Sequence, residues 1–295
     1  MPRGITSGPM TTSRARRRSR QWRAAVLLVA MLAGIGYAVW SRLPGDTGSI
    51  GAGSSATTTG TTGGASPAPA TRASQDSSGD PCAPAAADGI PAQPHEAQPL
   101  PDPAGARELL ASLVVAPRSG GDSYCRGRFG PDSWPDLDRN GCSTRQDVLV
   151  RQAATLTTRR IAAHDRTCDE AVAGTWVDPY TAETLTFTNL KDSAQAAQLQ
   201  IDHVVPLYNA WVSGARDWTD SQRVVFANDL ASPELRAVGG HVNFAKDRSG
   251  PESWVPVAAR QCDYARAFVA VKAHYRLTVT SAERDALARL LGTCS

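Results

Sequence analysis

The sequence contains no Cys-x-x-Cys pair, which argues against a zinc site built from thiolates. An even number of cysteines in an exported chain predicts disulfide bonds instead, although their spacing does not select one set of pairs. We expect one particular pair, Cys262 with Cys294, because these residues flank the last two predicted helices and an antiparallel helix pair would bring them together. The six cysteines are Cys82, Cys125, Cys142, Cys168, Cys262 and Cys294.

The body of the chain also lacks a net positive charge. The formal charge of +3 arises from eight arginines that precede Asp46, the first acidic residue. Beyond them the chain has 23 basic and 28 acidic residues, so the body is mildly acidic. This excludes a bulk electrostatic attraction to nucleic acid. Any contact with nucleic acid must therefore depend on a local basic patch or on a bound metal ion.

Large apolar side chains are almost missing between residues 44 and 80, where Gly, Ser, Thr, Ala and Pro dominate. Such a segment cannot bury enough apolar surface to offset the entropy of ordering. Residues 83–103 remain proline-rich, and apolar residues return at helical spacing from residue 104. We therefore predict a disordered stalk over residues 41–103 and a folded domain over 104–295.

The N-terminus has the features of an export signal. Residues 1–23 are rich in arginine, and residues 24–40 are uncharged and mostly apolar. By the positive-inside rule, residues 1–23 are cytoplasmic and the chain beyond the apolar segment is exported. The segment 24–40 is either a transmembrane signal anchor or a cleaved signal peptide. Trp40 and Arg42 are poor neighbours for a signal peptidase site, which favours the anchor. The protein is thus predicted to be extracytoplasmic, either membrane-anchored or secreted.

The folded part is predicted to be of the α+β class, because strand, strand and helix follow one another in its middle. Pro206 ends one strand, and a capping box of Thr280 and Glu283 begins the last helix. The predicted elements are a helix at 144–156 with Thr144 as N-cap, two strands around an Asp-Pro turn from residue 174, a strand ending before 206, helices at 208–214 and 220–227, a strand at 235–238, and helices at 242–246, 263–275 and 282–291.

The residues most suggestive of chemistry are Asp202 and His203, at the end of a predicted strand, and Asn243 with Lys246 on a later helix. An acidic residue and an amide or imidazole from a strand-turn-helix unit can bind one divalent cation. A histidine beside them can take a proton from water near neutral pH. Hydrolysis of a phosphodiester bond needs these parts.

The chain resembles the HNH (ββα-metal) endonucleases, in particular secreted actinobacterial HNH-family proteins related to the C-terminal domain of GmrSD-type restriction enzymes. The resemblance covers roughly residues 124–294. It is carried by the strings YCRGRFGPDSWPDLDRNGCSTR, GTWVDPYT, IDHVVPLYNAWVSGARDW, RVVFANDL and CDYARAFVAVKAHYRLTVTSAE, together with Asn243 and Lys246. It implies a ββα-metal core surrounded by helices.

Residue by residue, the resemblance implies that Asp202 and Asn243 are metal ligands and that His203 is the general base. Family members carry an asparagine that braces the loop of the base, often nine residues before the last ligand, where this chain has Glu234. We assign the bracing role to Asn228, the nearby asparagine.

Two basic residues, Lys246 and Arg223, are assigned to substrate binding. Further arginines could contact phosphates, namely Arg126, Arg128, Arg145 and Arg216. The sequence Ala-Lys-Asp-Arg at 245–248 replaces the Lys-Gly-Asp that is usual in relatives, so the turn after this helix is expected to differ.

A second cation site is suggested by Asp136, Asp138 and Asn140, which precede Gly141 in the order of a calcium-binding loop with Asp147 at its twelfth position. The alternative is a turn rich in Asx residues, fastened by the adjacent cysteine. No other residue pattern gives His95, His164 or His274 a partner, so these histidines are interpreted as structural or surface residues. The tryptophans at 134, 176, 211, 218 and 254 are interpreted as core.

The sequence therefore predicts an extracytoplasmic endonuclease that cleaves DNA with one divalent ion, Mg²⁺ first, with Mn²⁺ or Zn²⁺ as alternatives. The competing hypothesis is a non-catalytic cell-surface module in which the same residues bind a structural cation. No protein partner is evident from the sequence.

Overall fold

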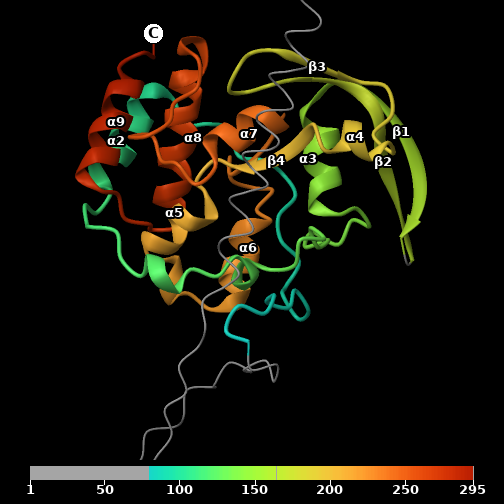
Figure 1. The fold of residues 1–295 in the computed structure, drawn as a ribbon, viewed down its shortest axis with the longest axis horizontal. Coiled ribbons are helices and arrows are strands. Elements are labelled where there is room, and N and C mark those ends of the chain that lie inside the picture. Colours follow the sequence, from blue (N-terminus) through green and yellow to red (C-terminus); the bar gives the residue numbers. More distant parts are fainter. Residues whose placement is uncertain (1–79, 164, 295) are drawn as a thin grey trace, which may run out of the picture. The chain divides into compact units, whose positions relative to one another are not determined.

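The computed structural model describes residues 80–163 and 165–294. They combine helices with two small antiparallel sheets, which confirms the α+β class (Figure 1). Among these residues, no helix is both long and apolar enough to cross a membrane. The basic N-terminus 1–23, the apolar segment 24–40 and the stalk up to residue 79 lie outside the described residues, so the predicted membrane anchor stays a prediction.

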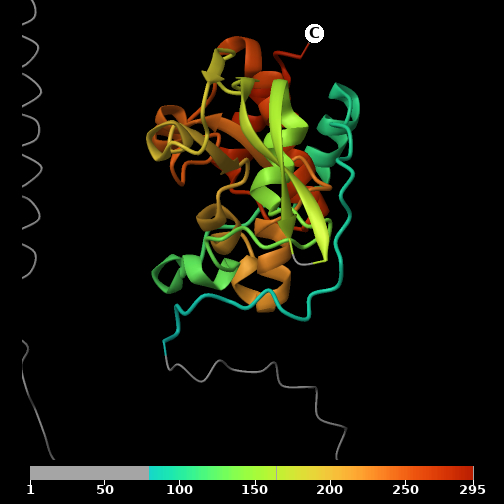
Figure 2. The same cartoon turned by 90° about the vertical axis from the view of Figure 1, so that its right-hand side faces the viewer.

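Residues 80–102, which we call the strap, run along the domain and are packed against it (Figure 2). Cys82 forms a disulfide with Cys125, and Ala85 and Ile90 are buried against Leu137 and other apolar residues. Backbone hydrogen bonds add further attachments. For this part of the chain the prediction of a disordered stalk was wrong, because a disulfide and a few well-placed apolar residues anchor a segment whose composition alone suggests disorder.

Helices form the larger apolar core. The capping box of Thr280 and Glu283 begins the last helix, as predicted. The helices around this core are α2 (Pro103–Ser112), α5 (Leu207–Val212), α6 (Asp220–Ala227), α8 (Gln261–His274) and α9 (Ser281–Leu291), with short 3-10 helices at Gly121–Ser123, Arg126–Phe129, Ala215–Asp217 and Ala258–Arg260.

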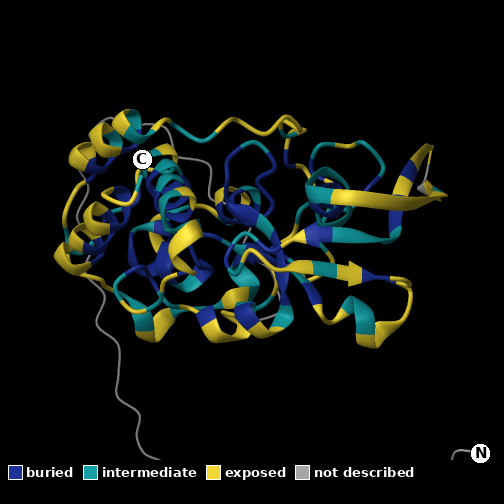
Figure 3. Cartoon of the chain, turned by 90° about the horizontal axis from the view of Figure 1, so that it is seen from above, coloured by how far each residue is buried: buried dark blue, intermediate teal, exposed yellow. Residues whose placement is uncertain are grey.

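A three-stranded antiparallel sheet, in the order β1-β2-β3, lies at the opposite side of the domain from α2 and α9 (Figure 1). Its strands are β1 (Ala153–Ala163), β2 (Arg166–Val177) and β3 (Thr184–Phe187). The projecting part of the hairpin β1-β2 is largely exposed, whereas buried residues gather where the helices meet the smaller sheet (Figure 3).

The helix before this sheet is shorter than predicted. It is α3 (Thr144–Gln152), its N-cap is Ser143 rather than Thr144, and β1 begins directly at Ala153. The prediction of helix through residue 156 was wrong because β-branched threonines at 155, 157 and 158 favour a strand that can pair with β2.

The second sheet consists of β4 (Leu199–His203) and β5 (Leu235–Gly239), which pair antiparallel with Asp202 opposite Arg236. The helices α5 and α6 are inserted between the two strands, and α7 (Gly240–Lys246) follows β5 directly and contacts both strands. A short helix, α4 (Ser193–Ala196), precedes β4. Successive side chains of a strand point to opposite faces, so Gln200 and Asp202 share one face of β4.

The six cysteines form three disulfides, Cys82–Cys125, Cys142–Cys168 and Cys262–Cys294. The last pair confirms the pairing expected from the sequence. It joins the start of α8 to the residues that follow α9.

We expect the double variant Cys262→Ser, Cys294→Ser to lower the free energy of unfolding by about 3–4 kcal/mol, because the bond constrains a loop with a sequence separation of 32 residues in the unfolded chain. Urea denaturation, with the other two disulfides intact in both proteins, measures this change. An unchanged midpoint and slope would show that the bond does not constrain the unfolded state.

Candidate active site

A cavity of about 450 Å³ lies beside β4 and α7 and is lined by Asp202, His203 and Asn243. The structure therefore brings the two predicted metal ligands and the predicted base to one place. Trp134, Arg126 and Arg248 line the same cavity. The other predicted site residues, Asn228, Arg223 and Lys246, lie outside its lining.

Asp202 is buried and has two partners within the protein. The Tyr180 hydroxyl donates to its Oδ2 at 2.6 Å, and the Lys246 ammonium lies 3.1 Å from Oδ1 and 2.9 Å from Oδ2. Burial raises the pKa of Asp202, while Lys246 and the Tyr180 hydroxyl act to lower it. Since a carboxylate oxygen can accept more than one hydrogen bond, Oδ1 keeps acceptor capacity for a ligand in the cavity.

Lys246 is fully buried, with an exposed fraction of 0%. Its ammonium group also donates to the backbone oxygen of His203 at 2.8 Å. It thus ties α7 to the end of β4 and balances the charge of Asp202. This position offers no route to a phosphate and does not support the substrate contact expected from the sequence.

His203 is held from two sides. Its Nε2 lies 2.9 Å from the backbone oxygen of Ala227, and its ring stacks on Trp134 with 5.6 Å between centroids and an interplanar angle of 13°. A carbonyl can only accept, so Nε2 must carry the hydrogen and Nδ1 the lone pair. Burial lowers the pKa of His203 from 6.5 to about 3. The imidazole is therefore neutral at physiological pH, with its lone pair on Nδ1.

Trp134 adopts a backbone φ of 56°, in the left-handed region that bulky residues rarely occupy. The chain accepts this strain and places the indole against the imidazole of His203, at the edge of the cavity. Strained residues of this kind cluster at functional sites. Asp247, directly after α7, also has a positive φ of 45°, a backbone conformation that favours glycine.

Glu234 fastens the loop that follows His203. Its backbone oxygen accepts from the amide of Val204 at 2.7 Å, and its side-chain Oε2 accepts from the amide of Val205 at 3.0 Å. Complete burial raises the pKa of this carboxyl well above its usual value. Asn228, to which the sequence analysis assigned the bracing role, donates through Nδ2 to the Val224 backbone oxygen at 2.9 Å. It is the C-cap of α6 and directly follows Ala227, whose backbone oxygen contacts His203.

The orientation of the Asn243 amide follows from a chain of hydrogen bonds. Gln200 donates through Nε2 to the Ala197 oxygen at 3.0 Å, which leaves its Oε1 to accept from Asn243 Nδ2 at 2.8 Å. With its nitrogen engaged by Gln200, Asn243 has its Oδ1 left as an acceptor, the atom that a cation requires.

Two arginines of the cavity lining are more than half exposed, and each is ion-paired with one neighbouring carboxylate, Arg126 with Asp132 and Arg248 with Asp247. The side chain of Arg126 is 51% exposed and that of Arg248 is 64% exposed. Arg223, by contrast, is buried on α6, where its guanidinium donates to the backbone oxygens of Ala215 and Trp218. It holds the turn before α6 rather than facing the cavity.

The loop of Asp136, Asp138 and Asn140 is a network of Asx turns. Both Asp136 oxygens accept backbone amides, from residues 140 and 141, and Asn140 Oδ1 accepts from the Cys142 amide at 2.6 Å. These turns are the alternative that the sequence analysis gave to a calcium-binding loop. Because an amide oxygen has two lone pairs, the bond to Asn140 Oδ1 does not exclude a cation, and the calcium site stays a prediction.

The sequence is similar to one protein family and to a fungal protein. The family model for the C-terminal domain of GmrSD restriction endonucleases matches residues 153–290. A protein of Arthroderma benhamiae named "Uncharacterized secreted protein" is 42% identical over 196 residues, which cover 66% of this chain and 87% of that protein. This relative is fungal, whereas the resemblance stated above was to actinobacterial proteins. No solved structure matches the chain.

Proposed function

Because this chain belongs to the family of the GmrSD restriction endonuclease C-terminal domain, we propose that it is an HNH-type, metal-dependent endonuclease that hydrolyses phosphodiester bonds in DNA. The observation that carries the proposal is the convergence of a neutral imidazole, a carboxylate and an amide oxygen in one cavity. The succession β4, β5 and α7, with α7 against both strands, supports a ββα-metal core.

The residues of the cavity fit a divalent cation. Asp202 supplies a charged oxygen and Asn243 a neutral one, and Mg²⁺ prefers such oxygen ligands, while Mn²⁺ also accepts them. When bound, such an ion neutralises charge that develops on the phosphate and its leaving oxygen.

Proton transfer and phosphate binding are assigned to side chains of the protein. His203 takes the proton of the attacking water at Nδ1, while the Ala227 carbonyl and the Trp134 indole keep its ring in place. Arg126 and Arg248 bind the phosphates on either side of the scissile bond, which supplies the local positive charge that the acidic body lacks.

The protein is extracytoplasmic. Its three disulfides require an oxidising compartment, and its fungal relative is a secreted protein. We propose that residues 24–40 keep it attached to the membrane, a proposal that fractionation of intact cells tests.

The proposal is tested by incubating supercoiled plasmid with the full-length oxidised protein. We expect nicking and linearisation with Mg²⁺ or Mn²⁺, none after chelation with EDTA, and recovery when the ion is added back. Cleavage that survives exhaustive chelation would overturn the metal requirement.

Gln200→Leu is expected to raise the Mg²⁺ concentration for half-maximal cleavage by about 10–100-fold, because residues that orient a metal ligand have effects of this size. The variant frees the Asn243 amide to turn its nitrogen towards the cavity. The matched control is Gln198→Leu, an exposed glutamine just before β4. Equal Mg²⁺ requirements in the two variants would argue against Asn243 as a ligand.

A further inference from the structure

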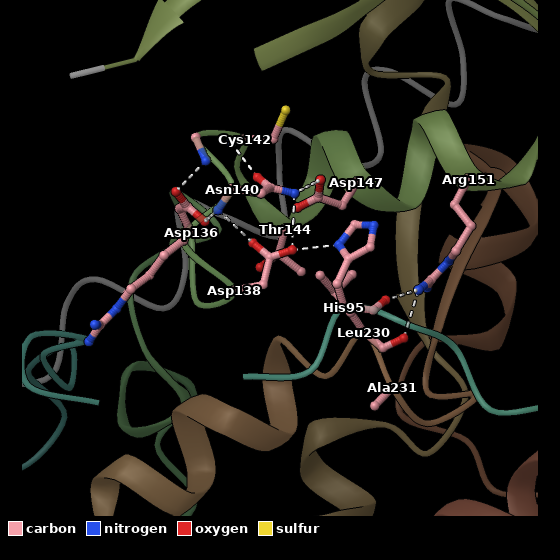
Figure 4. A network of polar contacts seen from close by, with 12 residues as sticks. His95, Asp136, Asp138, Asn140, Cys142, Thr144, Asp147, Arg151, Leu230 and Ala231 are labelled. Carbon is pink, nitrogen blue, oxygen red and sulfur yellow. Dashed lines mark hydrogen bonds and ion pairs between the residues drawn. The ribbon is translucent and has the colours of Figure 1, made fainter. Parts of the chain in front are cut away.

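Outside the proposed active site, a second cluster of ligand-type side chains joins three distant parts of the chain. His95 comes from the strap, Asp138 from the loop before α3, and Asp147 from α3 itself (Figure 4). One ligand atom of each lies within 4.8 Å of the others. We propose that these three residues bind one divalent transition-metal ion, for which Zn²⁺ is the best match, and that this ion fastens the strap to α3.

The first argument is geometric. His95 Nδ1 lies 2.5 Å from Asp138 Oδ2, and Figure 4 shows the three side chains facing one another. Ligand atoms around a four-coordinate Zn²⁺ are about 3.4 Å apart, as metal-ligand bonds of 2.0–2.2 Å require. His95 Nδ1 and Asp138 Oδ2 form a hydrogen bond in the structure, so metal binding would require the His95 ring, which is 53% exposed, to turn and replace that bond. The exposed side also leaves room for water as a further ligand.

The second argument is an unpartnered buried oxygen. Asp147 is only 6% exposed, and its Oδ2 is buried without a hydrogen-bond partner among the described residues. A buried carboxylate oxygen is costly unless it is paired or coordinates a metal. A cation bound here would supply the missing partner.

The third argument is the way Asn140 arranges the two carboxylates. Its Nδ2 donates to Asp138 Oδ2 at 3.0 Å and to Asp147 Oδ1 at 2.8 Å. Its Oδ1 accepts a hydrogen bond from the backbone amide of Cys142, and Cys142 is held by its disulfide to Cys168. Asn140 thus orients both carboxylates from one side, as residues around a metal site commonly do.

The donor set selects the class of metal. Ca²⁺ and Mg²⁺ take oxygen ligands, whereas an imidazole with two carboxylates suits Zn²⁺ and, less strongly, Mn²⁺. This differs from the calcium site expected from the sequence, which did not include His95. The site is also separate from the proposed catalytic one, because it shares none of the residues that line that cavity.

The test is isothermal titration of the full-length, oxidised, metal-stripped protein with Zn²⁺, followed by Ca²⁺ and Mg²⁺. We expect His95→Ala to lose one equivalent of bound Zn²⁺, and Asp147→Asn to lose the same equivalent. The matched control is His274→Ala, another exposed histidine, which should bind as the wild type does. Any ion at the proposed active site contributes equally to His95→Ala and His274→Ala, so it does not affect the comparison.

Limited proteolysis of the wild type, His95→Ala and His274→Ala tests whether the ion fastens the strap. Glu96 is exposed beside His95, so a glutamate-specific protease should cleave there more slowly with Zn²⁺ in the wild type and in His274→Ala, but not in His95→Ala. Equal Zn²⁺ stoichiometry and affinity in His95→Ala and His274→Ala would overturn the proposal, and so would tighter binding of Ca²⁺ than of Zn²⁺ by this cluster.

Discussion

Replacing His203 with alanine is expected to slow DNA cleavage by about 10²–10⁴-fold while leaving the affinity for DNA and for the divalent ion nearly unchanged. The side chain contributes a neutral imidazole whose Nδ1 has a free lone pair, and its removal takes away the proton acceptor but none of the proposed ligands. Single-turnover kinetics on a labelled duplex measure the rate, and filter binding in Ca²⁺ measures the affinity.

The control for this variant is His274→Ala, which removes an exposed imidazole on α8 and should cleave at the wild-type rate. Asp202→Asn should behave differently from His203→Ala, because loss of the charged oxygen weakens ion binding itself. A His203→Ala protein of undiminished activity would remove the imidazole from the mechanism.

The second large effect concerns stability. Lys246→Met is expected to lower the free energy of unfolding by about 3–5 kcal/mol, because it leaves Asp202 buried without its counter-charge. The double variant Asp202→Asn, Lys246→Met should recover most of this loss, since replacing both members of a buried ion pair is often nearly neutral. Urea denaturation of the single and double variants gives both values.

A matched control is Lys191→Met, which breaks a lysine-carboxylate pair in which the lysine is 49% exposed. Such a surface pair contributes less than about 1 kcal/mol. If Lys246→Met destabilises the protein no more than Lys191→Met, Lys246 is not the structural counter-charge described here.

Much of the framework of the site could be predicted from local sequence. A strand ending before Pro206, a strand at 235–238 and a helix at 242–246 were expected, and the structure has β4, β5 and α7 there. These short-range patterns placed Asp202, His203 and Asn243 on neighbouring elements, and the fold brings them to one cavity. The resemblance to a known family supplied the same residues.

The partners of these residues could not be predicted, because they come from distant segments with no local pattern. Trp134 was interpreted as core, yet it stacks on His203, and Tyr180 was not singled out, yet it donates to Asp202. The string GTWVDPYT contained the one signal for Tyr180. Lys246 was assigned to substrate binding, and only the packing of α7 reveals that it is buried.

The strap shows that composition alone does not predict whether a segment is ordered. Its prolines and small residues suggested disorder, whereas part of it is packed against the domain. The disulfide at Cys82 and the contact of His95 with Asp138 depend on partners in the folded domain. Neither partner can be identified from the strap's own sequence.

The most direct measurement of the central claim is chemical rescue of His203→Gly by imidazole. If His203 is the general base of a metal-dependent endonuclease, cleavage by this variant should rise with imidazole concentration and should still require Mg²⁺ or Mn²⁺. The space left by the side chain opens onto the cavity and can admit the small base. A wild-type protein that fails to cleave DNA with every divalent ion tested would contradict this account and favour the non-catalytic module. A His203→Gly variant whose cleavage is unaffected by imidazole would contradict the role of His203 as the base.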